Sequence, residues 1–320
     1  MRKKLIACLC VSLLVVSLAG CSSTEELLTY HQASGVAAID TRLSQADYFS
    51  EDLVTVTQED NNGNAEELSG TGSSLLVDVT DQKLLYAEHV YDRLYPASLT
   101  KLMTALVVLQ YGELSDQVTV SYAASHITEG GAKLCGFAEG DKISMEALLK
   151  SLLVYSGNDA AIAIADHISG SEEAFVQKMN EEAAKIGAVH TNFVNSNGLH
   201  NEEQYTTAYD MYLIFNELLS FDTIRSIINT DSYTAVYHDK DGTEKQKTFE
   251  ATNQYLSGKS EVPEGIEILG GKTGTTSKAG SCLVLLSKDA AGMEYISVIM
   301  KSSGSEALYS QMSFLLGFIK

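Results

Sequence analysis

Three short motifs in this 320-residue chain combine hydroxyl and amine groups at spacings that suit acyl transfer. Ser98-Leu99-Thr100-Lys101 is the only Ser-x-x-Lys sequence, Ser156-Gly157-Asn158 the only Ser-x-Asn, and Lys272-Thr273-Gly274 the only Lys-Thr-Gly. Each motif alone is a weak signal, because such short patterns arise by chance in a chain of this length. Their order along the chain and their local contexts together indicate one catalytic site.

The first motif supplies a nucleophile and a base. Ser98 follows Pro96-Ala97 at the start of a helix predicted over 98–109, where the helix dipole favours a developing alkoxide. Lys101 lies one turn later on the same face, within reach of that hydroxyl. A lysine acts as a base only when it is neutral, and lowering its pKa from about 10.4 to near 7.5 takes about 4 kcal/mol. We expect burial and a second cation, Lys272, to supply this free energy.

The other two motifs offer proton transfer and substrate binding. Ser156 and Asn158 lie at a predicted loop-to-helix junction, where the hydroxyl can relay a proton and the amide can hold Lys101 or a substrate amide. Residues 272–276 continue an apolar strand with a cation, hydroxyls and an exposed edge, which suits an extended peptide ending in a carboxylate. Each residue also has an ordinary structural interpretation as a helix cap, a solvated lysine or a strand residue. The assignment therefore depends on all three motifs together.

Hydrophobic periodicity and turn residues predict the elements that carry these motifs. Strands are expected at 74–79, 83–88, 266–273, 281–287 and 294–300, and a polar hairpin at 232–249. Helices are expected at 98–109, 144–154, 157–168, 171–186, 206–219 and 304–318. Strands at both ends with helices between them predict an α+β fold, with an antiparallel sheet packed by helices and an inserted helical lobe.

The N-terminus has the pattern of an export signal. Three basic residues precede an apolar run over 5–18 that is too short to span a bilayer. Leu18-Ala19-Gly20-Cys21 resembles the lipobox of bacterial lipoproteins, in which the cysteine is lipidated and becomes the new N-terminus. We expect a lipid-anchored protein on the extracytoplasmic face of the bacterial membrane, with a secreted form as the alternative. The expected division is a lipoprotein signal peptide at 1–20, a polar tether or N-terminal segment at 21–68, and a catalytic domain at 69–320.

Composition excludes several classes of protein. With 42 acidic and 22 basic residues the net charge is −20, which argues against nucleic acid as a partner and against polybasic binding to anionic lipid. Outside the signal and Cys21 only Cys135 and Cys282 remain, which excludes a disulfide scaffold; we expect two buried thiols, with one bridge between them as the open alternative. The seven histidines show no zinc-like spacing, so no metal or organic cofactor is expected.

Over residues 69–320 the sequence resembles the serine-type D-Ala-D-Ala carboxypeptidases, the low-molecular-weight penicillin-binding proteins. The matching stretches are 73–78, 95–105, 156–161, 191–195, 198–199 and 271–276. This resemblance implies a β-lactamase/transpeptidase-like fold with Ser98 as acyl-ester nucleophile, Lys101 as base and Ser156 as proton relay. It also implies an oxyanion hole from the backbone amides of Ser98 and Thr275. The implied substrate-binding residues are Asn158, Lys272, Thr273, Gly274 and Thr275.

The implied reaction is removal of the terminal D-Ala from peptidoglycan stem peptides in cell-wall and cell-shape metabolism, with β-lactam antibiotics acylating the same serine. A DD-endopeptidase, a β-lactamase on the same fold and a non-catalytic wall-binding lipoprotein are the alternatives. One departure is Asn195-Ser196-Asn197-Gly198-Leu199, where the family often has Asn-Pro-His-Gly-Leu. Many relatives also carry a C-terminal β-domain and an amphipathic membrane helix, and we expect the N-terminal lipid to replace that anchor.

Overall fold

The computed structural model describes residues 53–57 and 65–319, all of them within one unit that spans Tyr48–Lys320. The predicted signal peptide, the lipidation site Cys21 and most of the segment 21–68 lie outside the described residues.

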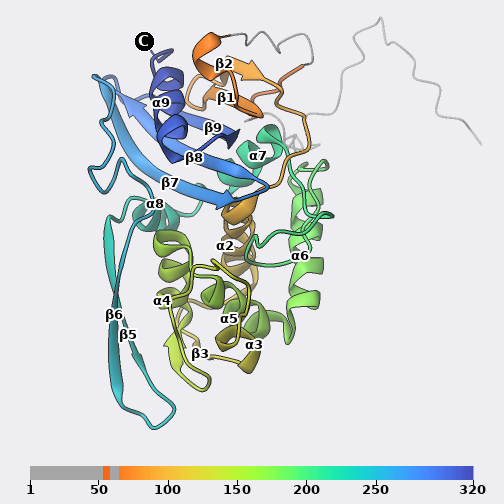
Figure 1. Ribbon diagram of the computed structural model, residues 1–320, viewed down its shortest axis with the longest axis vertical. Helices are drawn as coiled ribbons and strands as arrows, with labels where there is room; N and C mark the ends of the chain where they lie inside the picture. Colours follow the sequence, from red (N-terminus) through yellow and green to blue (C-terminus); the bar gives the residue numbers. More distant parts are fainter. Residues whose placement is uncertain (1–52, 58–64, 320) are drawn as a thin grey trace, which may run out of the picture. The chain divides into compact units, whose positions relative to one another are not determined.

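The larger of two sheets carries the third motif on its edge. Its strands are β1 (Ser73–Asp78), β2 (Lys83–Glu88), β7 (Ile266–Thr276), β8 (Gly280–Asp289) and β9 (Glu294–Ser302). All neighbours are antiparallel, in the order β2-β1-β9-β8-β7, so β7 has one unpaired edge (Figure 1). An edge strand presents free backbone N–H and C=O groups, to which an extended peptide can bind.

Both faces of this sheet are apolar, because helices cover both. Leu283 and Leu285 of β8 pack on one side with α9 (Ser305–Leu316) and η1 (Glu66–Leu68). Val284 and Leu286 point to the other side, into the core that the sheet shares with the helical lobe. Alternate residues of a strand point to opposite faces, so this continuous apolar run is what a two-sided sheet requires.

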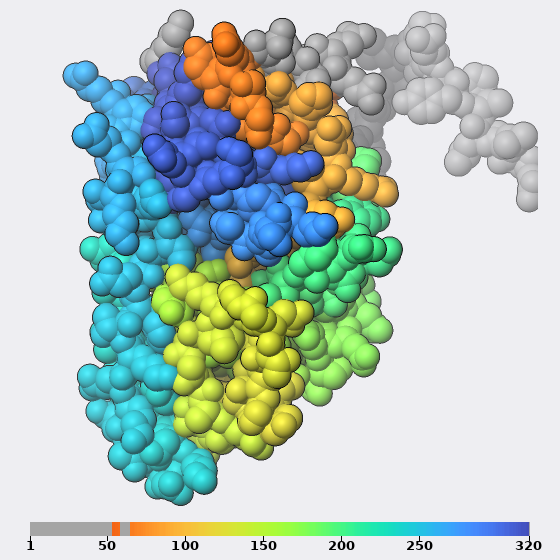
Figure 2. Space-filling view, viewed as in Figure 1, coloured from red at the N-terminus to blue at the C-terminus, as the bar shows by residue number. Residues whose placement is uncertain are grey.

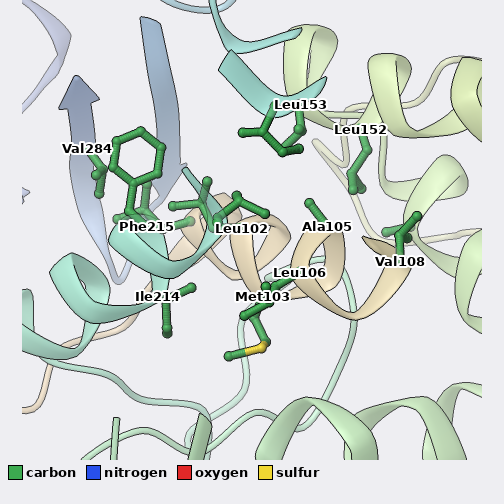
Figure 3. Packing of buried hydrophobic residues seen from close by; sticks show 14 of the residues in the cluster. Leu102, Met103, Ala105, Leu106, Val108, Leu152, Leu153, Ile214, Phe215 and Val284 are labelled. Atoms are coloured by element: carbon green, nitrogen blue, oxygen red, sulfur yellow. The ribbon is translucent and has the colours of Figure 1, made fainter. Parts of the chain in front are cut away.

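The helical lobe surrounds one central helix. Its elements are η2 (Ala97–Leu99), α2 (Thr100–Tyr111), α3 (Tyr122–Ser125), α4 (Met145–Lys150), the π-helical segment η3 (Ser151–Tyr155), α5 (Asn158–Ser169), α6 (Glu172–Lys185), α7 (Ala208–Leu218) and α8 (Asp222–Ile228). The first nine residues of α2 are all buried. Figure 3 shows apolar side chains of α2, η3, α7 and β8 converging: Leu102, Leu106, Leu152, Leu153, Ile214, Phe215 and Val284. The predicted α+β architecture with a helical lobe is confirmed.

The second sheet was only half predicted. It consists of β3 (Gln117–Thr119), β4 (Lys142–Ser144), β5 (Ser232–His238) and β6 (Glu244–Glu250), in the order β3-β4-β5-β6. The polar hairpin expected at 232–249 forms β5 and β6, which extend beside the helical lobe (Figure 1). Strands β3 and β4 are three residues each, too short to produce a period-2 pattern.

Two short stretches ahead of residue 69 pack on the domain. Val54 is buried, its N–H donates to the Tyr212 hydroxyl at 3.0 Å, and its carbonyl accepts from the Tyr209 hydroxyl at 3.0 Å. Leu68 is buried beneath α9 in the smaller apolar cluster. These parts of the predicted N-terminal segment dock on the domain core. Among the described residues, no helix has the length and apolar character needed to cross a membrane.

Candidate active site

A cleft of about 630 Å³ brings the three motifs together at the free edge of β7. In Figure 2 the blue surface of the sheet faces the yellow surface of the helical lobe across this region. Five residues of the motifs line the cleft, together with Thr275: Ser98, Ser156, Asn158, Thr273 and Gly274. The two motif lysines lie behind them, with no exposed surface of their own.

Ser98 lies in a tight turn rather than in the first turn of an α-helix. The 3₁₀ segment η2 carries it, and α2 begins two residues later. Ala97 has a φ of 48°, a strained conformation for a residue with a side chain. Its carbonyl accepts a hydrogen bond from the Thr100 hydroxyl at 2.8 Å. Gly198 packs against the same carbonyl so closely that a Cβ at 198 would lie 1.9 Å from its oxygen. The turn that presents Ser98 is therefore fixed by its neighbours.

Lys101 has the surroundings of a neutral base. Its Nζ lies 3.0 Å from Ser98 Oγ and 2.7 Å from Asn158 Oδ1, and it also donates to the backbone carbonyl of Asn197. The amide oxygen of Asn158 and the carbonyl of Asn197 can only accept hydrogen bonds. A neutral amine has two N–H groups and one lone pair, so these two acceptors leave the lone pair directed at the Ser98 hydroxyl.

Burial is the main cause of the low basicity of Lys101. Removal of the ammonium group from water lowers the pKa of Lys101 to about 7; the negative charge of Asp159 opposes this shift and the positive charge of Lys133 adds to it. We expected Lys272 to be the second cation acting on Lys101. The charges of the two amines do repel each other, and Lys133, in a loop that lines the cleft, is a further cation that lowers the pKa of Lys101.

Lys272 contacts the second motif through Ser156. Its Nζ donates to Ser156 Oγ at 2.9 Å and to the carbonyl of Thr273 at 2.8 Å. Burial first, and then the charge of Lys101, lower the pKa of Lys272 well below its ordinary value. The repulsion between the two motif lysines is mutual, so each amine disfavours the charged form of the other. The Lys272 amine does not line the cleft, but its hydrogen-bond partner Ser156 does. Thr273 and Thr275 line the cleft with their own atoms.

Ser156 occupies the junction between η3 and α5, as the sequence predicts. It adopts a left-handed conformation, with φ 74° and ψ 35°, which ends the π-helical turn and orients its hydroxyl toward Lys272. The following Gly157 cannot carry a side chain, because a Cβ there would lie 2.2 Å from the sulfur of Cys135. The glycine in Ser-Gly-Asn is therefore explained by packing.

Asp159 holds one wall of the cleft and had no role in the sequence analysis. Its buried carboxylate accepts hydrogen bonds at 2.9, 2.7 and 3.3 Å from three successive backbone amides, those of Cys135, Gly136 and Phe137. The carbonyl of Lys133 accepts from the Asn158 amide at 2.9 Å, and Lys133 Nζ lies 4.1 Å above the ring of Tyr155. These contacts fix the position of the Lys133 loop relative to α5.

The segment 195–199, which departs from the family pattern, forms an ordered turn. Asn195 Oδ1 accepts from the Gly198 amide at 2.8 Å, and Asn197 Oδ1 accepts from the Leu199 amide at 2.8 Å. Gly198 has a φ of 85°, which favours glycine. Asparagine side chains thus build the turn that presents the carbonyl of Asn197 to Lys101, a contact that no motif spacing indicates.

Gly274 allows β7 to approach the nucleophile. A Cβ on Gly274 would lie 3.0 Å from the Ser98 nitrogen and 3.0 Å from the Pro96 carbonyl. The next residue, Thr275, is exposed at the cleft, and Thr273 is fixed by its hydroxyl, which donates to Thr252 Oγ1 at 2.6 Å. The absence of a side chain at 274 is therefore a steric requirement for this pairing of strand and turn.

Comparison with known proteins identifies the family. The model of the peptidase S11 family, described as D-alanyl-D-alanine carboxypeptidase, matches residues 60–304. The chain belongs to the S11 family. D-alanyl-D-alanine carboxypeptidase DacF of Bacillus subtilis is 34% identical over 254 residues, which cover 77% of this chain and 61% of DacF. DacC of Escherichia coli is 32% identical over 250 residues, which cover 76% of this chain and 59% of DacC.

Solved structures of S11-like proteins share this fold. The crystal structure of the Streptomyces K15 DD-transpeptidase has a TM-score of 0.71 and 28% identity, covering 78% of this chain and 96% of that one. Penicillin binding protein 5 from Haemophilus influenzae has a TM-score of 0.68 and 28% identity, covering 78% of this chain and 70% of that one. The S11 chain spans about three fifths of the length of the curated relatives it matches. The predicted family and transpeptidase-like fold are confirmed.

Cys135 and Cys282 of this S11 protein are free and buried, as predicted. Burial raises the pKa of Cys282 to about 11, so this thiol stays protonated at neutral pH. Within residues 53–57 and 65–319, no group of three or more His, Cys, Asp or Glu side chains is arranged to hold a metal ion.

Proposed function

We propose that the protein is a serine D-alanyl-D-alanine carboxypeptidase that removes the terminal D-Ala from peptidoglycan stem peptides and binds penicillins through Ser98. The observation that carries the proposal is the 3.0 Å contact between Ser98 Oγ and Lys101 Nζ. The pKa of this lysine is about 7. A base with a pKa near the working pH combines a useful neutral fraction with a useful driving force for proton transfer. Membership of the S11 family supports the same reaction.

Acylation uses the first two motifs. Ser98 Oγ bonds to the carbonyl carbon of the penultimate D-Ala while its proton passes to Lys101 Nζ. The amides of Ser98 and Thr275 are the proposed donors to the oxyanion. When the C–N bond breaks, the proton held on Lys101 passes through the Ser156 hydroxyl to the leaving nitrogen, which restores neutral Lys101; Ser156 Oγ is held 2.9 Å from Lys272 Nζ. The products are an ester on Ser98 and free D-Ala.

Deacylation reuses the base. A water molecule gives its proton to Lys101 as it adds to the ester carbon, and collapse of that intermediate restores the Ser98 hydroxyl and releases the shortened peptide. No metal or organic cofactor enters either step, since the groups named here supply and accept every proton.

Substrate binding uses the free edge of β7. Thr273 and Thr275 line the cleft; the exposed Thr275 offers its hydroxyl to the terminal carboxylate, and Asn158 Nδ2 is available to the acyl-side amide. A carboxylate brought near Lys272 favours its charged form, so binding raises the pKa that burial has lowered. We assign Lys272 to carboxylate recognition through this charge, with Gly274 leaving room for the peptide beside Ser98.

The proposal includes an extracytoplasmic location. The apolar run ending in Leu18-Ala19-Gly20-Cys21 supports cleavage before Cys21, lipidation of that cysteine and retention at the membrane surface. Residues 21–68 then act as the N-terminal segment of a catalytic domain that spans 69–320. This location gives the enzyme access to peptidoglycan.

Mass spectrometry of a pentapeptide ending in D-Ala-D-Ala tests the reaction. Incubation with the purified protein should remove one alanine, and a fluorescent penicillin should label Ser98; Ser98→Ala should abolish both. Rapid lactam turnover without D-Ala release would indicate a β-lactamase instead. Cleavage of cross-linked peptides alone would indicate an endopeptidase, and absence of labelling would indicate a non-catalytic wall-binding protein.

A further inference from the structure

A second pocket, of about 240 Å³, is lined by three basic side chains: Arg93, Lys278 and Lys301. Arg93 lies 4.4 Å from the centre of the Tyr205 ring, and Glu202 is the one carboxylate in the lining. All three basic residues are exposed, and none forms an ion pair with another described residue. The whole chain has a net charge of −20, so three basic side chains without ion pairs around one pocket are a local excess of positive charge. We call these three residues with their pocket the cationic pocket.

The cationic pocket lies beyond the end of the strand that borders the cleft. Lys278 follows the last residue of β7, Thr276, by two positions. A shallow groove lies between the two hollows: it shares Thr276 and His200 with the cleft and Tyr95 with the cationic pocket. The cleft and the cationic pocket are therefore neighbours on the surface, with Thr276 and Tyr95 between them.

The direction of the proposed substrate matches this arrangement. With the scissile carbonyl beside Ser98 and Thr275, and the terminal carboxylate beside Thr273, the acyl portion must extend the other way along β7. Lys278 lies in the turn 277–279, three residues after Thr275, so the two Cα atoms are at most about 10 Å apart. A side chain on either of the two residues preceding D-Ala-D-Ala can therefore reach the cationic pocket.

The backbone around Lys301 is built to place this residue. Lys301 has a φ of 59°, and the pairing of β8 with β9 shifts register between Ser281 and Leu283. Bulges of this kind redirect side chains near functional sites. Gly72 permits the arrangement, because a Cβ there would lie 2.8 Å from Lys301 Cβ. A strained residue that lines a pocket and has no ion-pair partner among the described residues supports a binding role.

We propose that the cationic pocket is a subsite that binds a carboxylate on the acyl portion of the peptide, one or two residues before D-Ala-D-Ala. This inference rests on the proposed carboxypeptidase function. Exposed cations contribute modestly to binding, and an equally strong contact in the ground and transition states changes KM rather than kcat. Two or three such contacts should favour an acidic peptide by about three- to tenfold in kcat/KM.

The test compares two pairs of acetylated pentapeptides ending in D-Ala-D-Ala. Within each pair the peptides differ only by Glu or Gln, placed one or two residues before D-Ala-D-Ala. The wild type should prefer Glu in at least one pair, through KM, and the preference should shrink as NaCl rises from 0.05 to 0.5 M. Lys278→Gln with Lys301→Gln should reduce the preference to the part that Arg93 alone supplies, and Lys278→Glu should reverse it. Lys240→Gln, in the exposed turn between β5 and β6, is the matched charge control and should keep it.

The outcomes separate this inference from the function on which it rests. If penicillin labels Ser98 and both peptides of each pair are cleaved equally well, the cationic pocket is not a subsite while the proposed function stands. A Glu preference of wild-type size in folded Lys278→Gln/Lys301→Gln protein, as judged by circular dichroism, also overturns the inference. Absence of both labelling and cleavage overturns the proposed function and the subsite together.

Discussion

Lys101 and Asn158 are joined by a 2.7 Å hydrogen bond from Nζ to Oδ1, which ties the nucleophile-bearing segment to the first residue of α5. The bond connects two motifs that are 57 residues apart in the sequence. It also determines which way the amine lone pair points, because Asn158 and the carbonyl of Asn197 occupy the two N–H groups of the neutral lysine. The proton acceptor of Ser98 is therefore oriented by residues outside its own helix.

The rate of Ser98 acylation should follow the ionisation of Lys101. Neutral lysine is the base, and with a pKa of about 7 the neutral fraction falls about tenfold per pH unit below pH 7. The second-order rate constant for a fluorescent penicillin should thus rise steeply between pH 5 and 7 and level off above about pH 8. A rate that declines as pH rises through 7 would contradict the assignment of Lys101 as the base.

Asn158→Asp should move this pH profile upward. The new carboxylate would lie at the position of an oxygen 2.7 Å from Lys101 Nζ, and an adjacent negative charge favours the ammonium form. Acylation at pH 7 should fall at least tenfold and recover partly at pH 9. The control is Asn180→Asp on α6, whose side chain bonds the backbone of Phe193 instead. An unchanged pH profile for Asn158→Asp would show that this bond does not tune the base.

Lys101→Ala should remove the base. We expect acylation of Ser98 to decrease by a factor on the order of 10² to 10⁴. Folding should survive, because the substitution deletes a buried amine rather than leaving a charge unpaired. Lys150→Ala, at an exposed ion pair with Glu146 on α4, is the matched lysine control and should acylate like the wild type. The measurement is the rate at which a fluorescent penicillin labels Ser98 at pH 8. Equal rates for Lys101→Ala and wild type would exclude Lys101 as the base.

Gly274→Ala should separate β7 from the nucleophile turn. A methyl group at this position meets the Ser98 nitrogen and the Pro96 carbonyl at 3.0 Å, and both are backbone atoms that cannot rotate away. We expect a loss of acylation of about tenfold or more, because a shift of about 1 Å near reacting groups costs on the order of 10²-fold. Gly292→Ala, where the surroundings are open but φ is 87°, controls for strain alone. Wild-type acylation by Gly274→Ala would show that the strand tolerates the methyl group.

Cys21→Ala should change the location of the protein. The short apolar segment that ends in Leu-Ala-Gly-Cys predicts lipidation at this residue, so the variant should appear in the medium or remain as an unprocessed precursor. Membrane fractionation with mass measurement of the N-terminus is the readout. Cys10→Ala, inside the same apolar run, should behave like the wild type. Normal processing and membrane retention of Cys21→Ala would rule out the lipoprotein assignment.

The sequence by itself determined the motifs, their order and most elements that carry them. The helix expected at 98–109 is found at 100–111 after a short 3₁₀ turn, and the strand expected at 266–273 runs to 276. These predictions succeed because periodicity, caps and turn residues act within a few positions of the chain. The resemblance to the family rests on the same three motifs. Their order along the chain is typical of one arrangement of nucleophile, base and cation.

Only the tertiary structure decided what surrounds the base. The carbonyl of Asn197 contacts Lys101 across 96 positions, and Lys133, which belongs to none of the three motifs, is a further cation that lowers its pKa. Asp159 holds the Lys133 loop by accepting hydrogen bonds from backbone amides. Backbone amides do not depend on the residue type, so no sequence pattern indicates these contacts. A pKa depends on burial and on charges brought close by distant parts of the chain. Those distances exist only after the sheet and the helical lobe have packed together.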